Sequence, residues 1–240
     1  MSQTVNQSVK PYIIVSDGAC SRNPGPGGWG LIVVTPEDQV FEYGAHEPET
    51  TNNRMELMGL YRGMQEIYKI ESKKQTTKVI HVITDSKYVM DGASKYVANW
   101  ARSAWRTSTG TEVKNQDLWE KILKGLSEFQ KIKMRFEWEL VKGHSGHEGN
   151  ERCDQIAVAY TKNDPVDLYH GPLSGYSVKV GTHQKVESFN PMYLSYVDGV
   201  LSRHTTWEEC QNATVGISGA KYKKVKTSQE EQDTLKLWGL

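Results

Sequence analysis

The fold is decided by the stretch Tyr12-Ile13-Ile14-Val15-Ser16-Asp17-Gly18-Ala19-Cys20. Its continuous apolar run is typical of a β-strand that is buried on both faces of a sheet. The run ends in Asp17, and an ionised carboxylate is costly in such a place unless it is paired or binds a metal ion. If this acid stood alone, a turn-forming role at the end of the strand would explain it equally well.

Three further acids occupy matching places along the chain. Asp85 follows a second apolar run and so ends another expected strand. Glu56 and Asp154 fall in the first turns of expected helices over residues 54–70 and 150–161. An acid that complements the helix dipole would explain either of these two alone. Because an α/β sheet can bring all four acids to one edge, the set indicates a shared site.

The chemistry of this acid set favours a divalent metal. Carboxylates a few ångströms apart raise one another's pKa, and divalent cations reverse that effect. Mg²⁺ prefers carboxylate, water and phosphate oxygens. Two such ions can clamp an in-line phosphoryl displacement. The residues therefore favour Mg²⁺, with Mn²⁺ as the alternative metal.

The composition bounds the class of protein. With 240 residues, 37% of them hydrophobic and 24% charged, the chain is typical of a soluble globular protein with one large or two unequal domains. No apolar run reaches about 18 residues, so we expect no membrane span. The three cysteines are odd in number and far apart, which favours a reducing compartment, and we expect a cytoplasmic monomer. Because the formal net charge is zero, binding of nucleic acid would need local patches.

The alternation of elements predicts an α/β fold in which a five-stranded mixed sheet is flanked by helices. Three strands form an antiparallel meander, and the strand that ends at Asp85 follows a helix and so runs parallel to the first. The expected strands cover residues 12–17, 29–35, 39–43, 78–84 and 133–141. Gly59 and Gly63 weaken the helix over 54–70 by about 1 kcal/mol each, and close packing on another backbone would compensate.

Two further segments carry residues suited to chemistry or binding. Between residues 93 and 110, aromatic side chains interleave with Lys and Arg, a pattern that suits contacts with a nucleic-acid backbone. An amphipathic helix with core tryptophans is the alternative. The Gly-rich loop that begins at Gly143 places His144 on its flexible side, where a solvated loop histidine is the plainer explanation.

Five motifs in series resemble the type 1 ribonuclease H family over residues 12–162. They are Asp17-Gly18-Ala19-Cys20, Asn23-Pro24-Gly25-Pro26-Gly27-Gly28-Trp29-Gly30, Thr51-Asn52-Asn53-Arg54-Met55-Glu56-Leu57, Thr84-Asp85-Ser86, and Gly143-His144 through Asp154. The resemblance implies a ribonuclease H-like fold and hydrolysis of the RNA strand of an RNA–DNA hybrid, which leaves a 5′-phosphate and a 3′-hydroxyl.

The same resemblance implies roles for individual residues. It makes Asp17, Glu56, Asp85 and Asp154 the ligands of two Mg²⁺ ions. His144 is then the mobile group that assists proton transfer or product release, and Glu151 is a supporting acid outside the ligand set.

The resemblance also implies substrate contacts. Asn23, Asn52 and Asn53 match positions that meet RNA 2′-hydroxyls, the group that distinguishes RNA from DNA. Thr51 and Asn115 match a DNA-phosphate pocket, although Glu49 stands where many relatives carry Arg. A substrate-binding segment, here called the handle, is matched by Tyr96, Trp100 and Trp105 and is less basic than in some bacterial members.

The C-terminal part resembles the hybrid-binding domain of eukaryotic ribonuclease H, which usually precedes the catalytic domain and here follows it. By that likeness Trp207 and Tyr222 stack on DNA sugars, Lys223 and Lys224 meet phosphates, and Tyr193 is a third aromatic. A small packed domain with a solvated lysine strand and a core Trp207 is the alternative. We therefore expect four segments: a flexible N-terminus over 1–11, a catalytic domain over 12–162, a linker over 163–190 and a small α+β hybrid-binding domain over 191–240. Packing of Leu168, Tyr169 and Tyr176 on the catalytic domain is the alternative for the linker.

Three functions fit these patterns. The first is a hybrid-specific nuclease with a tethering module. The second is a hybrid-binding protein with a degenerate site, but binding alone does not need four clustered acids. The third is another enzyme of the same fold, such as a DNA resolvase or a strand transferase, and the Asn set and the handle argue against it.

Overall fold

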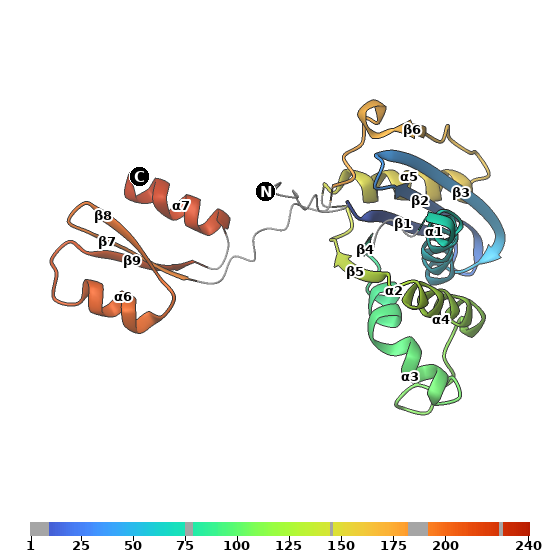
Figure 1. Cartoon of the computed structure of the whole chain (residues 1–240), viewed down its shortest axis with the longest axis horizontal. Coiled ribbons are helices and arrows are strands. Elements are labelled where there is room, and N and C mark those ends of the chain that lie inside the picture. Colours follow the sequence, from blue (N-terminus) through green and yellow to red (C-terminus); the bar gives the residue numbers. More distant parts are fainter. Residues whose placement is uncertain (1–9, 75–78, 145, 182–191, 226–227) are drawn as a thin grey trace, which may run out of the picture. The chain divides into compact units, whose positions relative to one another are not determined.

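A computed structural model of the chain describes residues 10–74, 79–144, 146–181, 192–225 and 228–240. The chain divides into two compact units, Met1–Thr182 and His183–Leu240, and each has its own sheet (Figure 1). Within the described ranges, no helix combines the length and the apolar character that a membrane span requires.

The first unit is built on a mixed sheet of six strands in the order β5-β4-β1-β2-β3-β6. The strands are β1 (Tyr12–Cys20), β2 (Gly25–Val34), β3 (Gln39–Thr50), β4 (Val79–Thr84), β5 (Arg135–Leu140) and β6 (His170–Pro172). Strands β1, β2 and β3 form the predicted antiparallel meander, whereas β4 and β5 run parallel to β1. The mixed sheet is therefore confirmed, and the short β6 adds a sixth strand to the five that were predicted.

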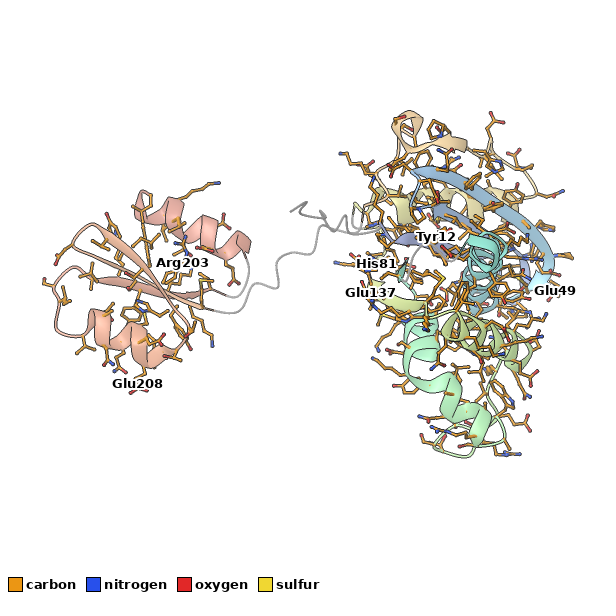
Figure 2. The ribbon with its side chains drawn as sticks, viewed as in Figure 1. Tyr12, Glu49, His81, Glu137, Arg203 and Glu208 are labelled. Carbon is orange, nitrogen blue, oxygen red and sulfur yellow. The ribbon has the colours of Figure 1, made fainter. Side chains whose placement is uncertain are left out.

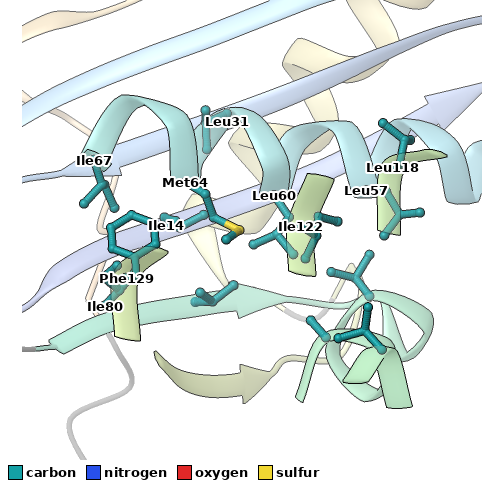
Figure 3. Close-up of a cluster of buried hydrophobic side chains, with 14 of the residues drawn as sticks. Ile14, Leu31, Leu57, Leu60, Met64, Ile67, Ile80, Leu118, Ile122 and Phe129 are labelled. Carbon is teal, nitrogen blue, oxygen red and sulfur yellow. The ribbon is translucent and has the colours of Figure 1, made fainter. Parts of the chain in front are cut away.

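Helices cover both faces of this sheet. Helices α1 (Asn52–Lys74) and α4 (Gln116–Lys131) lie over one face, and α5 (Glu148–Thr161) lies over the other. Between β4 and α4 the chain forms α2 (Lys87–Asp91), the π-helical turn Gly92–Tyr96 and α3 (Val97–Arg102). Figure 3 shows the larger core, in which Met64 of α1 faces Ile14 and Ile80 of the sheet and Phe129 of α4.

Glycines let the helices approach the central strands closely. A Cβ at Gly59 would lie 3.0 Å from the Ser16 Cβ, and one at Gly63 would lie 3.1 Å from the Ile14 side chain, which confirms the predicted close packing of α1. On the opposite face, a Cβ at Gly30 would lie 2.2 Å from the Cys153 carbonyl oxygen. Helices α1 and α5 therefore pack closely on β1 and β2, and this close packing fixes the positions of the side chains that the two helices carry.

The predicted linker over 163–190 is wrong for its first part, because residues 163–181 belong to the first unit. Strand β6 pairs with β3, the rings of Tyr169 and Tyr176 pack on the smaller core, and Val180 is buried in it. Burial of the apolar surface of these side chains holds the segment against the sheet edge, although the segment is rich in Gly and Pro. Residues 182–190 lie outside the described residues, as do residues 1–9 of the flexible N-terminus that was predicted over 1–11.

The second unit is a small α+β structure, as predicted. Strands β7 (Met192–Val197), β8 (Val200–His204) and β9 (Lys221–Val225) form an antiparallel sheet in the order β8-β7-β9. Helix α6 (Trp207–Thr214) begins with the predicted capping box between Thr206 and Glu209, and α7 (Ser228–Trp238) ends the unit. Figure 1 shows the two helices on opposite faces of the sheet.

Candidate active site

The four predicted acids come from four different elements that converge on one edge of the first sheet. Asp17 near the end of β1 and Asp85 just after β4 lie together because these strands are parallel neighbours. Glu56 is brought in by α1, since a Cβ at Gly18 would lie only 2.3 Å from the Glu56 backbone nitrogen. Asp154 follows Cys153, whose carbonyl oxygen lies over Gly30, the residue paired with Asp17.

The helix positions of two acids differ from the prediction. Helix α1 begins at Asn52 and α5 at Glu148, so Glu56 and Asp154 lie in second turns and not in first turns. The α5 helix starts early because the His147 side chain caps it, with Nδ1 accepting a hydrogen bond from the Asn150 N–H at 3.1 Å. Compensation of a helix dipole therefore does not explain either acid.

Burial leaves the negative charge of this acid set poorly compensated. Asp17 is 8% exposed, and burial, followed by the charges of Asp85, Asp154 and Glu56, raises the pKa of Asp17 to about 8. The Gly18 N–H, 2.7 Å from Oδ1, offsets only part of this shift. Burial and the Asp85 charge also raise the pKa of Glu56. A site that favours protonated carboxylates near neutral pH is one that a cation would stabilise.

Two residues that the sequence analysis did not single out orient these acids. The Ser86 hydroxyl caps α2 and donates to Glu56 Oε2 at 2.5 Å, while the Asn150 amide donates to Asp85 Oδ2 at 3.2 Å. Asn52 donates to the other oxygen of Glu56 at 2.8 Å. The available signals were the place of Ser86 directly after Asp85 and the i,i+4 spacing of Asn150 and Asp154 on one helix face.

The donor set fits hard divalent cations, whose preferred ligands are carboxylate oxygens. Within the described ranges, no three acid, histidine or cysteine side chains lie close enough together to coordinate one ion as they stand. A bound cation would therefore have to draw the carboxylates inward, and it would offset the burial and the neighbouring negative charges that raise the pKa values of Asp17 and Glu56.

The predicted proton-transfer residue lies beside this edge on a loop. His144 is exposed, has a left-handed φ of 52°, and sits between β5 and α5. Glu151 accepts a hydrogen bond from the Gly146 N–H at 2.9 Å, so it ties the loop to α5 and stands apart from the acid set.

The residues predicted to contact RNA gather at the start of α1. Asn23 accepts a hydrogen bond from the Asn52 N–H at 3.0 Å, and Asn53 is exposed next to it. The carbonyl of Thr51 accepts the first helical hydrogen bonds, from Arg54 and Met55. The Asn set therefore lies directly beside Glu56.

The two residues of the predicted phosphate pocket lie at the N-termini of two linked helices. Arg54, three residues after Thr51, makes a two-pronged salt bridge of 2.8 and 2.6 Å to Asp117, two residues after Asn115. Asn115 has a left-handed φ of 59° and donates to the Tyr88 hydroxyl at 3.3 Å. Glu49, labelled in Figure 2, is an exposed residue of β3.

In the handle, the aromatic residues are partly packed in the core and partly exposed to solvent, so each of the two explanations, core packing and nucleic-acid contact, fits some of them. Trp100 and Trp105 are half-buried against the larger core, and the Trp100 ring packs edge-on against Trp119 with centroids 5.4 Å apart. Tyr96 is 45% exposed and lies 5.7 Å from Trp100. The handle is thus a core-anchored ridge that presents Tyr96 and the outer edges of two tryptophans to solvent.

In the second unit, the predicted aromatics form one group, here called the aromatic cluster, in which Trp207 and Tyr222 are exposed and Tyr193 is half-buried. The Trp207 ring lies 5.6 Å from Tyr193 and 5.3 Å from Tyr222, and the Lys224 ammonium lies 5.1 Å above the Tyr193 ring. Trp207 is 41% exposed, so the alternative of a core tryptophan is wrong. Tyr193, predicted as a third aromatic, belongs to the cluster.

The two predicted phosphate-binding lysines lie on opposite faces of this small sheet. Lys224 pairs with Tyr193, whereas Lys223 pairs with Leu194, and neighbouring strand residues point to opposite sides. Arg203, labelled in Figure 2, also pairs with Leu194 and reaches Glu231 of α7 at 2.7 Å. Lys223 therefore lies on the α7 side and Lys224 on the side of the aromatic cluster.

Comparison with known families matches both units. The family model described as RNase H matches residues 9–162, and the model described as the ribonuclease H1 N-terminal domain matches residues 204–233. Proteins named Ribonuclease H are similar to the first unit. The one from Prochlorococcus marinus (strain NATL1A) is 43% identical over 153 residues, which cover 64% of this chain and 89% of that protein. The one from Alcanivorax borkumensis is 44% identical over 149 residues, or 62% and 90% of the two chains.

Solved structures share the fold of the first unit. LC9-RNase H1, described as a type 1 RNase H with the type 2 active-site motif, matches with a TM-score of 0.53 and 26% identity over 70% of this chain and 81% of that one. The RNase H domain of PFV matches with a TM-score of 0.52 and 22% identity over 64% and 97% of the two chains.

Proposed function

The chain belongs to the ribonuclease H family, and we propose that it cuts the RNA strand of RNA–DNA hybrids with two divalent cations, leaving 5′-phosphate and 3′-hydroxyl ends. The observation that carries the proposal is the convergence of four carboxylates from four elements, where burial and mutual repulsion raise the pKa of Asp17 to about 8. Binding a hybrid does not need such a site, whereas metal-assisted phosphoryl transfer does.

In this proposal Asp17, Glu56, Asp85 and Asp154 hold the cations, which when bound supply an activated water and stabilise the leaving oxygen. Ser86 and Asn150 fix the carboxylates of Glu56 and Asp85 through the hydrogen bonds described above. His144, exposed on its loop, delivers a proton to the 3′-oxygen as that oxygen leaves.

Recognition of the RNA strand falls to the Asn set at the start of α1. Asn23, Asn52 and Asn53 lie beside Glu56 and offer amide groups that can bond the 2′-hydroxyl, which DNA lacks. Thr51 and Asn115 bind a phosphate of the DNA strand, and the exposed edge of the handle contacts the same strand. The scissile phosphate is thereby set on the RNA strand next to the acids.

The second unit binds the hybrid and takes no part in the cleavage reaction. Sugars of the DNA strand stack on the exposed rings of Trp207 and Tyr222 and on the half-buried ring of Tyr193 beside them. Lys224 meets a phosphate there. Lys223, on the opposite face, makes a smaller contribution to the same interaction.

The test is a cleavage gel on short labelled duplexes of one sequence: an RNA–DNA hybrid, an RNA duplex and a DNA duplex. Each is incubated with the full chain in Mg²⁺, in Mn²⁺ or in chelator. We expect metal-dependent cutting of the RNA strand of the hybrid alone. Tight hybrid binding without cutting would establish a binding protein, and cutting of the DNA duplex would establish a different nuclease of this fold.

A further inference from the structure

The proposed function does not use the segment that follows α5. Residues 164–181, here called the strap, cross the sheet edge as β6 and are bound there by backbone hydrogen bonds, including Leu173 N–H to the Asp38 carbonyl at 2.7 Å. The rings of Tyr169 and Tyr176 contact each other with centroids 4.9 Å apart. These contacts make the strap an integral part of the first unit.

The middle of the strap completes a buried charge pair. The Glu42 carboxylate of β3 is fully buried and accepts both prongs of Arg152 from α5, each at 2.8 Å. The strap supplies the other two donors, the Tyr169 N–H at 2.9 Å and the Tyr176 hydroxyl at 2.6 Å. Arg152 in turn donates to the Asp167 carbonyl at 2.8 Å. A buried carboxylate needs such donors, so the strap helps to lock Arg152 in one geometry.

The far end of the strap reaches the first turn of α5. The Lys179 N–H donates to Glu148 Oε2 at 3.0 Å, and its ammonium lies 3.3 Å from Oε1. Val180 is 5% exposed and belongs to the smaller core with Cys153 and Val141. A Cβ at Gly149 would lie 2.9 Å from Val180, so the strap touches the helix backbone there.

Each of these two contacts lies two residues before a residue that α5 contributes to the candidate site. Arg152 precedes Asp154 by two positions, and Glu148 precedes Asn150, the partner of Asp85, by two. We propose that the strap is a positioning element that holds α5 so that Asp154 and Asn150 stand correctly for the reaction, with Tyr176 as its principal positioning residue. This inference rests on the proposed function.

The test replaces Tyr176→Phe in the full chain, which removes one donor to Glu42 and keeps the ring. The matched control is Ser174→Ala, an exposed residue of the same strap. Cleavage of a labelled hybrid is measured against hybrid concentration at a temperature where both variants are folded. We expect kcat of Tyr176→Phe to fall by about tenfold, with KM changed by less than about twofold, because the substrate contacts lie elsewhere. Ser174→Ala should match the wild type.

A second measurement does not depend on cleavage. Hydrogen exchange of amides in residues 148–156 should accelerate in Tyr176→Phe, while exchange in residues 52–58 of α1 stays as in the wild type. An unchanged kcat with a lowered urea midpoint would overturn the proposal and leave the strap a stabilising segment only. Unchanged exchange in 148–156 would overturn it as well. Failure of the wild type to cut hybrids would instead refute the proposed function, and the exchange result would still test the strap.

Discussion

The acid set of the first unit and the aromatic cluster of the second are built in opposite ways. The acids come from four elements spread between residues 17 and 154, and Asp17 among them is 8% exposed. The rings come from neighbouring elements between residues 193 and 222, and Tyr222 is 56% exposed. In the proposed function, the difference means that the chemistry depends on buried and half-buried acids fixed by backbone contacts. Binding of the hybrid depends on a surface group of rings on a small scaffold.

The strongest way to break this comparison is Asp17→Asn in the full chain. Removal of one metal ligand should lower cleavage by about a thousandfold or more, because metal stabilisation of the transition state is worth several kcal/mol. Hybrid binding should persist, since the aromatic cluster is untouched. Gel cleavage and fluorescence anisotropy measure the two effects. Asp38→Asn, an exposed acid paired with Lys10, serves as the control and should cleave normally. Full activity of Asp17→Asn would refute the metal assignment.

The reciprocal change is Trp207→Ala, which removes the ring at the centre of the aromatic cluster. Stacking on a nucleic acid is worth about 1–3 kcal/mol per ring, so the Kd for a hybrid should rise by about tenfold. Anisotropy in chelator measures binding without cleavage. Trp238→Ala, which removes a ring stacked on Tyr196 on the other face, should bind nearly as the wild type does. Equal losses in the two variants would contradict the assignment of the binding face.

The pH dependence of stability sharpens the contrast for the buried acids. The pKa of Asp17 is about 8 in the folded chain against 3.8 for an ordinary aspartate, because burial and the neighbouring acids favour the protonated form. The stability that this group contributes to metal-free protein is complete below about pH 4 and is lost as the pH rises to about 8. Urea unfolding should therefore show Asp17→Asn matching the wild type near pH 4 and exceeding it by a few kcal/mol near pH 8. If the free energy of unfolding varied with pH in the same way in the two proteins, the pKa of Asp17 would not be raised in the folded state.

The smallest expected effect is a difference in hybrid binding between substitutions of two adjacent lysines. Lys224→Ala should weaken hybrid binding by a few-fold and reduce the slope of log affinity against log salt by about one, because one phosphate contact is lost. Lys223→Ala, on the α7 face, should change both quantities less. A titration of hybrid binding against salt measures them. If Lys223→Ala has the larger effect, the hybrid does not lie on the aromatic face.

Much of this arrangement could be predicted from the sequence. The strands and the acid set follow from apolar runs that end in acids and from short motifs in a fixed order. The residues of the aromatic cluster follow from the resemblance of the C-terminal part to a hybrid-binding domain. The helix starts could not, because His147, which lacks the usual capping preference, begins α5 two residues before the expected start at Asn150. Asp154 therefore lies in the second turn of α5, and Glu56 lies in the second turn of α1 because that helix begins at Asn52, two residues before the expected start.

The remaining differences depend on tertiary contacts. The strap contains a strand of only three residues among Gly and Pro, which gives no periodic signal, and its stability comes from Glu42 and Arg152 far away in the sequence. The alternation of side chains along a strand already places Lys223 and Lys224 on opposite faces. Which of the two shares the face of the aromatic cluster depends on the pairing register with β7, which the sequence does not reveal. Ser86 and Asn150 act through hydrogen bonds across elements.

The central claim, that the first unit performs the chemistry and the second only holds the hybrid, is tested most directly by single-turnover cleavage. A trace of labelled hybrid is mixed with increasing concentrations of wild type or Trp207→Ala in Mg²⁺. We predict that the two proteins reach the same rate constant at saturation, and that Trp207→Ala needs about tenfold more protein to reach half of it. A lower saturating rate constant for Trp207→Ala would contradict the account, because the aromatic cluster would then take part in the chemical step.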